Sequence, residues 1–141
     1  MPVQVQTLDG GLGLYFYPVG VLTVKEVLPA LDIPENILRA ARYSLIDMAG
    51  IQATDLTGAH VRRIVARDRE NVSTNPDIVQ AFLAPKELPF GLGRMYSALS
   101  EPGGWPTAAF RHRMDAEQWI REEVGLELTF EADYPLRERW E

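Results

Sequence analysis

The sequence predicts an α/β fold in which a mixed β-sheet is covered by about four helices. Short apolar runs alternate along the chain with longer stretches in which apolar residues recur at helical spacing. Within residues 42–71, one such run ends at Asp47 and passes through a Gly-containing turn into a helix expected to begin at Thr54 or Asp55. Because segments of helix length separate the later strands, we expect right-handed crossovers between them.

The first part of the chain is predicted to form a hairpin followed by a helix. Residues 3–6 alternate apolar and polar side chains, and Asp9-Gly10-Gly11 separates them from residues 12–21, which are apolar on both faces. The second strand should therefore lie inside the sheet, with the first nearer an edge. Thr23 and Glu26 have capping-box spacing, so a helix should begin there, short or kinked by the proline that follows.

The later part of the chain adds two strands and two helices. Residues 79–84 are an apolar run and residues 107–110 a shorter one. Asp115 and Gln118 have a capping pattern for a helix that should end near Gly125. The strongest helical stripe lies between the two strands and consists of Leu88, Leu92, Met95 and Leu99.

The last residues form an extension of the domain. We place the domain at residues 1–125 and an arm at residues 126–141, in which Leu126, Leu128 and Phe130 alternate with polar residues as in a half-buried strand. An exposed edge strand promotes association, so the arm should pair within its own chain or complete a two-fold dimer interface; we favour the homodimer. The side chains expected to pack beside this strand are Tyr134, Leu136 and Trp140.

Composition excludes several classes of function. The 141 residues suit one domain, and the net charge of −6 argues against a general binder of nucleic acid or anionic membranes. Without cysteine, disulfides and thiolate chemistry are excluded. The longest apolar run is too short to span a bilayer, and no cationic segment precedes it. We therefore expect a soluble cytoplasmic protein with no transmembrane segment.

The sequence gives little support to catalysis or metal binding. Asp47, Asp55 and His60 are close in sequence, but no hydroxyl or thiol nucleophile with an oriented base can be inferred. Capping explains the two aspartates, and the spacing of the three matches no closed metal site. We expect no catalytic residue, no metal and no cofactor, and we favour binding over catalysis.

Two features have both a functional and a structural interpretation. Gly91 and Gly93 stand near a helix start, where they either allow close packing on the sheet or, with Arg94, cradle an anionic group. The basic residues are either an acid-binding patch or solvated faces, and solvation is the default. They are Arg62, Arg63, Arg67, Arg69 and the run Arg111-His112-Arg113.

A family resemblance emerges from the central stretch. The residues Asp47-Met48-Ala49-Gly50-Ile51 and Asp55-Leu56-Thr57-Gly58 resemble the signature of STAS domains, in which an aspartate ends a strand and an Asp-Ser-Ser-Gly-like turn opens the next helix. The segments FGLGRMYSAL (90–99) and FRHRMDAEQWI (110–120) look like the SpoIIAA-like branch of small bacterial proteins. The resemblance spans residues 12–120 and implies a STAS-like fold.

The resemblance also implies a regulatory role without enzymatic activity. STAS domains switch protein partners, often through phosphorylation of a hydroxyl beside the helix-opening glycine, a position that Thr57 occupies here. Leu56 replaces the other hydroxyl of the motif. A phosphate on Thr57 would meet free amides and the positive end of the helix dipole. The alternative is a purely structural threonine. The candidate partner-binding or phosphoacceptor residues are Asp55, Thr57, Gly58 and Arg63.

A second hypothesis is a pocket protein. Aromatic residues of the second strand and of the glycine-containing helix would enclose a cavity for a small apolar or lipid-like ligand, with an acidic head near Arg94. The candidate pocket residues are Tyr15, Tyr17, Phe90, Gly91, Gly93, Arg94 and Tyr96.

Overall fold

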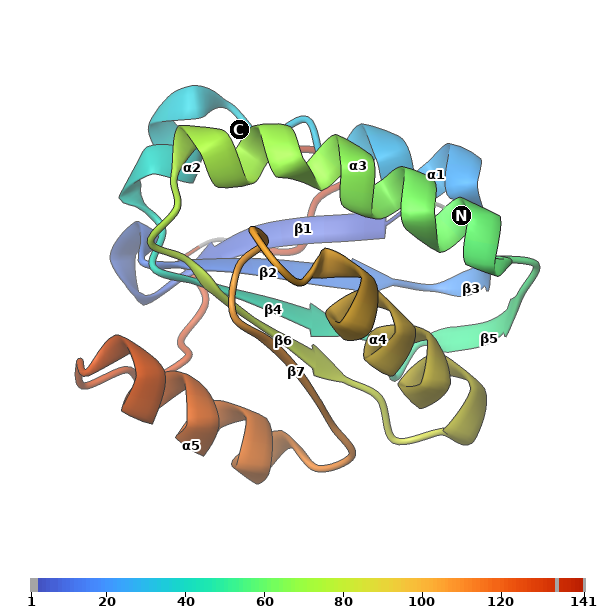
Figure 1. The fold of residues 1–141 in the computed structure, drawn as a ribbon. Coiled ribbons are helices and arrows are strands. Elements are labelled where there is room, and N and C mark those ends of the chain that lie inside the picture. The colour runs from blue at the N-terminus through green and yellow to red at the C-terminus, as the bar shows by residue number, and fades with distance from the viewer. Residues whose placement is uncertain (1–2, 134, 141) are drawn as a thin grey trace.

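The chain folds around one five-stranded mixed sheet. The computed structural model describes residues 3–133 and 135–140. The strand order is β1-β2-β4-β6-β7; only β1 and β2 are antiparallel, and the other neighbours are parallel (Figure 1). The predicted interior position of the second strand and edge position of the first are thus confirmed. The strands are β1 (Val3–Leu8), β2 (Gly13–Pro18), β4 (Tyr43–Asp47), β6 (Val79–Leu83) and β7 (Thr107–Phe110).

Helices cover both faces of this sheet. Five α-helices occur in the described chain, where about four were predicted. Four of them lie on one face: α1 (Val24–Ala30), α2 (Glu35–Ala40), α3 (Gly58–Thr74) and α4 (Glu87–Ser100). The fifth, α5 (Arg113–Val124), covers the other face together with the arm (Figure 1).

The period of two along β4 divides its side chains between these two layers. Ser44 and Ile46 face α1, α3 and α4, whereas Tyr43 and Leu45 face α5. The same alternation in β2 turns Phe16 towards the four-helix layer and its tyrosine neighbours towards α5. The apolar side chains on the two faces of these strands therefore belong to two separate cores.

A small second sheet was not predicted. Strands β3 (Gly20–Leu22) and β5 (Ile51–Thr54) pair in parallel beside the main sheet. In β5, residues 52 and 53 are both exposed, so this strand lacks the alternation of apolar and polar residues from which a strand is predicted. Thr54 belongs to this sheet, because its hydroxyl donates to the Leu22 carbonyl at 2.9 Å.

Two helix starts differ from the prediction. Helix α3 begins at Gly58 with Thr57 as its N-cap, later than the predicted Thr54 or Asp55, because Thr54 ends β5. Helix α5 begins at Arg113 rather than at Asp115, and its predicted end is confirmed by Gly125, which is left-handed with φ of 75°. Within the described residues, no helix has both the length and the apolar character needed to cross a membrane.

The arm does not contain the strand predicted for residues 126–130. Leu126 is 41% exposed, while Leu128 and Phe130 are buried in the core beneath α5. Phe130 has φ of 61°, which breaks an extended run. Further on, the arm runs antiparallel to the edge strand β1 of its own chain, where Val5 and Arg137 exchange backbone hydrogen bonds of 2.7 and 2.9 Å. A single chain does not test the predicted homodimer through residues 126–141, which stays a prediction.

Two aspartates fasten the arm to the turn between β1 and β2. Asp9 accepts hydrogen bonds from the amides of Thr129 and Phe130 at 2.8 and 3.0 Å. In return, Asp133 accepts hydrogen bonds from the amides of Gly10 and Gly11, each at 2.9 Å. These contacts order the arm without a long regular strand.

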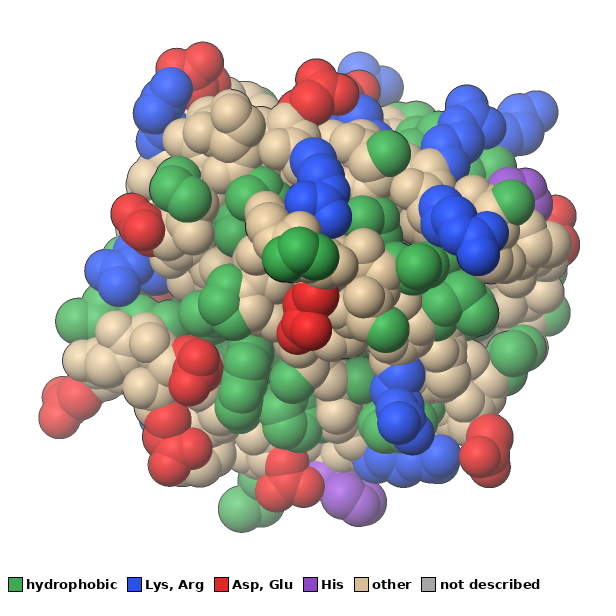
Figure 2. All heavy atoms as spheres, viewed as in Figure 1, with side chains coloured by type: hydrophobic (Ala, Val, Ile, Leu, Met, Phe, Trp, Pro, Cys, Tyr) green, Lys and Arg blue, Asp and Glu red, His purple; other side chains and the backbone are tan. Residues whose placement is uncertain are grey.

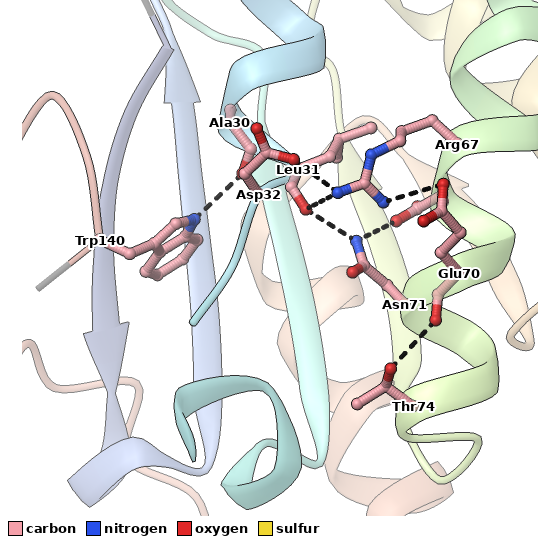
Figure 3. Close-up of polar contacts among 9 residues, drawn as sticks. Ala30, Leu31, Asp32, Arg67, Glu70, Asn71, Thr74 and Trp140 are labelled. Atoms are coloured by element: carbon pink, nitrogen blue, oxygen red, sulfur yellow. Dashed lines mark hydrogen bonds and ion pairs between the residues drawn. The ribbon is translucent and has the colours of Figure 1, made fainter. Parts of the chain in front are cut away.

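The end of the arm reaches the four-helix layer. Trp140 is buried, packs edge-on against Phe16 with ring centroids 5.2 Å apart, and donates its indole N–H to the Ala30 carbonyl at 3.0 Å (Figure 3). The next carbonyl, that of Leu31, accepts a hydrogen bond from Asn71 of α3. The unpaired carbonyls that end α1 are thus satisfied by the arm and by α3. Of the other residues expected here, Leu136 is 38% exposed and Tyr134 lies outside the described residues.

Candidate functional site

The start of α3 presents an exposed hydroxyl. Thr57 is the N-cap residue of this 17-residue helix. Its Oγ1 accepts a hydrogen bond from the amide of His60 at 3.3 Å, and its own amide donates to Nδ1 of His60 at 3.1 Å. This is a capping box in which histidine takes the position usual for Glu or Gln. Thr57 therefore has a structural role, and its side chain is also accessible.

The residues around Thr57 form one surface with α4. A Cβ on Gly58 would lie 3.9 Å from Sδ of Met95, so the α3 start and α4 are adjacent. Asp55 is exposed two residues before Thr57, and Arg63 is exposed at the sixth residue of α3, where it lines a groove beside α1. The four sequence-predicted partner-binding residues therefore lie in and before the first two turns of α3, but not all on one side of it. Figure 2 shows basic side chains gathered at the right of the view, where α3 begins.

A groove leads from this surface along α1. Its lining includes Lys25 from α1 and Arg63 and Arg67 from α3. Arg67 is already occupied, since its guanidinium contacts Asp32 at 2.5 Å (Figure 3). Among the described residues, Lys25 and Arg63 have no ion pair, so two cations remain available to an acidic ligand in this groove.

The other predicted basic residues divide by role. Arg69 donates to the carbonyls of Pro102 and Ser100 at 3.0 and 3.2 Å, which ties α3 to the loop after α4. Arg111 contacts Glu87 at 3.6 Å. Of the predicted basic residues on α3, only Arg62 and Arg63 are exposed and have no hydrogen bond or ion pair to another described side chain or carbonyl. A patch that binds acidic groups is therefore limited to these two residues near the start of α3.

The structure separates the predicted pocket residues. Tyr15 and Tyr17 lie on the α5 face, where the Tyr15 hydroxyl donates to Asp47 at 2.5 Å and the Arg113 guanidinium lies 5.9 Å from the Tyr15 ring centroid. Burial, together with the hydrogen bond to the Asp47 carboxylate, raises the pKa of Tyr15 far above its ordinary value. The two tyrosines lie on this face because side chains alternate along a strand. Phe16 faces the four-helix layer, so its neighbours Tyr15 and Tyr17 face α5.

The glycine-containing helix also spreads its residues over different surroundings. Gly91 and Arg94 are exposed, and Phe90 lies beneath the Arg111 guanidinium, 4.5 Å from its ring centroid. Gly93 faces the sheet instead, so Gly91 and Gly93 do not form one cradle. Tyr96 alone, of the seven predicted pocket residues, lines the cavity between the sheet and α1, α3 and α4.

This cavity contains a buried polar cluster that sequence reasoning missed. The Tyr96 hydroxyl donates to the Asp68 carboxylate, which also accepts a 3.0 Å hydrogen bond from Asn71. Burial raises the pKa of Asp68 above its ordinary value, although both hydrogen bonds oppose the shift. The sequence did contain a signal for this cluster, because Asp68 and Asn71 continue the helical stripe of Val61, Ile64 and Val65. Polar residues in phase with an apolar stripe indicate a buried network.

The residues weighed for catalysis do not form a group. Asp47 is buried beneath α5, Asp55 is exposed, and His60 serves the helix cap. Across residues 3–133 and 135–140, no three His, Asp or Glu side chains are arranged to hold a metal ion.

Comparison with known proteins finds likeness in structure. No protein-family model matches the chain, and no curated protein matches it. One similar structure is that of an uncharacterised protein of the DUF3478 family from Shewanella loihica PV-4, which is described as having a SpoIIAA-like fold. It superposes with a TM-score of 0.53 at 18% sequence identity, and the match covers 84% of this chain and 91% of the Shewanella chain. A second is the anti-sigma factor antagonist SpoIIAA in its unphosphorylated form, with a TM-score of 0.51 at 10% sequence identity over 84% of this chain and 97% of the SpoIIAA chain. The chain therefore has a SpoIIAA-like fold, as the STAS resemblance predicted.

Proposed function

We propose that the chain is a non-enzymatic, regulatory protein-binding module whose recognition surface is the start of α3. The surface comprises Asp55, Thr57, Gly58 and Arg63. The observation that carries the proposal is the exposed Thr57 at the N-cap of a long helix, together with a groove along that helix in which Lys25 and Arg63 have no ion pair among the described residues.

Physical chemistry supports Thr57 as a switch. A phosphate here would add a charge of about −1.5 to −2 at neutral pH and meet first-turn amides that have no partner inside the helix. Helix α3 has no acidic residue in its first turn, so the positive end of its dipole is not neutralised from within the helix. The exposed Asp55 is the acidic group nearest to Thr57 in the sequence. The SpoIIAA neighbour, described as an anti-sigma factor antagonist in an unphosphorylated form, supports a regulatory role by analogy of fold.

The local charge favours an acidic segment of the partner. Lys25 and Arg63 line the groove between α1 and α3. The chain as a whole has a net charge of −6, so this basic end contrasts with the remaining surface and would orient an acidic partner. Phosphorylation of Thr57 would then weaken binding by introducing like charge into the contact.

Site-specific photocrosslinking tests the surface. A photoreactive residue replaces Ala59, which is exposed in the first turn of α3 and is not one of the four recognition residues, and a control replaces Glu122, which is exposed on α5 at the opposite face. In cells of the source organism, we expect a defined protein adduct from position 59 and none of the same mass from position 122. Identical adducts from both positions, or none from position 59, would refute the proposed surface.

Two capping variants test the switch itself. Thr57→Asp and Thr57→Asn both cap helices well, so both should fold, but only aspartate adds a negative charge. We expect the crosslink at position 59 to be lost in Thr57→Asp and retained in Thr57→Asn. Equal crosslinking in the two variants would remove the charge switch, and peptide mapping that never finds phosphate on Thr57 would do the same.

A further inference from the structure

A cavity of about 100 Å³ lies between the sheet and the helices α1, α3 and α4. Most of its wall is apolar. Its lining includes Leu56, next to the helix cap, and Trp105, which precedes β7. This space is much larger than the roughly 10–15 Å³ that one water requires, and of the order of the 150 Å³ cavity known to accept benzene. Its size therefore suits an occupant with about as many atoms as a six-membered ring.

One wall of the cavity is polar. Ser44 of β4 and Gln80 of β6 are neighbours in the parallel register, 1% and 3% exposed, and both line the cavity with Tyr96 and Asp68. Tyr96 bonds to Asp68 and interacts with Gln80. The Ser44 hydroxyl differs, because its Oγ has no hydrogen-bond partner in the described chain. A buried hydroxyl on a central strand is costly unless something outside the chain completes its hydrogen bonding.

We propose that this cavity binds a small neutral molecule with a compact apolar body and one hydroxyl group, of the phenol or cyclic alcohol class, and that the hydroxyl meets Ser44 Oγ. Serine can donate to and accept from such a group. An anion is disfavoured by the Asp68 carboxylate in the same wall, and a cation finds both carboxylate oxygens already bonded to Tyr96 and Asn71. Water would be confined to the polar wall, because each water needs two to four polar partners and the rest of the lining is apolar.

The test uses phenol and benzene as probes of the full-length chain. Phenol should bind and shift the methyl NMR signals of Ile46, Val61 and Leu92, which line the cavity. Nuclear Overhauser contacts from the ring protons to these methyl groups locate the probe. Because a single hydrogen bond is removed, Ser44→Ala should weaken phenol binding about fivefold to tenfold while benzene affinity is unchanged or increased.

A matched serine gives the control. Ser100 is 3% exposed, but its hydroxyl donates to the Ser97 carbonyl and does not line the cavity. Ser100→Ala should leave the ratio of phenol to benzene affinity unchanged. The proposal is overturned if neither probe binds at millimolar concentration, if the contacts lie elsewhere, or if both serine variants change the ratio equally. Should Ser44→Ala not fold, the contacts in the wild-type chain decide alone. None of these outcomes depends on the protein-binding surface at Thr57.

Discussion

Replacing each of the two glycines of α4 by alanine tests why they are there. Alanine in a helix interior is favoured over glycine by about 0.8–1.0 kcal/mol, a gain available at both positions. At Gly91 a Cβ would meet nothing within 4 Å. At Gly93 it would lie 3.0 Å from Cβ and 3.2 Å from Cγ of the buried Phe82. Overpacking of this kind costs about 1–3 kcal/mol, which cancels or exceeds the helix gain.

We therefore expect Gly91→Ala to stabilise the chain by about 1 kcal/mol and Gly93→Ala to be neutral or destabilising by up to about 2 kcal/mol. At about 3 °C per kcal/mol for a chain of this length, the two melting temperatures should differ by about 3–9 °C. Thermal unfolding followed by circular dichroism measures both, and urea unfolding provides the free energies. Equal stabilisation by the two substitutions would show that close packing on Phe82 is not the reason for Gly93.

Two further predictions concern the arm. Hydrogen bonds from Thr129, Tyr43 and Phe130 outweigh burial, the largest single influence, and hold the pKa of Asp9 below its ordinary value of 3.8. The stability that ionised Asp9 contributes is therefore present above that value and is lost as the pH falls through the lower folded-state pKa. The difference in urea unfolding between wild type and Asp9→Asn should begin to narrow below about pH 4; a gap independent of pH would contradict this. Deleting residues 126–141 should cost about 1.5–3 kcal/mol for each buried apolar side chain removed. Light scattering of the full-length chain tests the homodimer predicted through residues 126–141, in which arms that pair with β1 of their own chain would also meet a second copy. A full-length chain that is monomeric at high micromolar concentration would refute the dimer.

The main sheet was predictable because its strands are apolar and its crossovers are helical in length. The position of β4 in the middle of the sheet and the helix end at Gly125 follow from local patterns alone. The small sheet of β3 and β5 was not predictable in this way, since each strand has a single buried residue, Leu22 in β3 and Ile51 in β5, and no alternating pattern. The position of the α3 cap was ambiguous because Thr54, Asp55 and Thr57 are all good capping residues, and a tertiary hydrogen bond to Leu22 decides among them.

The candidate sites were predictable to different degrees. The α3 start depends on residues adjacent in sequence, so a local motif was enough to bring Asp55, Thr57 and Gly58 together. The residues that line the cavity depend on which face of β2 is turned towards α1, α3 and α4. A strand that is apolar on both faces does not reveal this in its sequence. The sequence alone therefore does not separate Tyr15 and Tyr17 from Phe16, which is the one of these three that lines the cavity. The bonds of Asp9 to the arm join residues about 120 positions apart and leave no local pattern.

Helix α1 is the weakest cover of the cavity. It has seven residues, includes a proline and has no buried residue. Its carbonyl end is held by Asn71 and by the indole of Trp140, which donates to Ala30 (Figure 3). An element held by few buried contacts opens at low free energy, so α1 amides should exchange with deuterium faster than those of α4.

Trp140→Phe keeps an aromatic ring against Phe16 but removes the donor to Ala30, and it should speed exchange in α1 about threefold to tenfold while leaving α4 unchanged. Hydrogen exchange read by mass spectrometry of peptides from the two helices measures this ratio. Equal acceleration in both helices would mean that the substitution acts through global unfolding. In that case Trp140 would be part of the common core, and α1 would not be a separately opening cover.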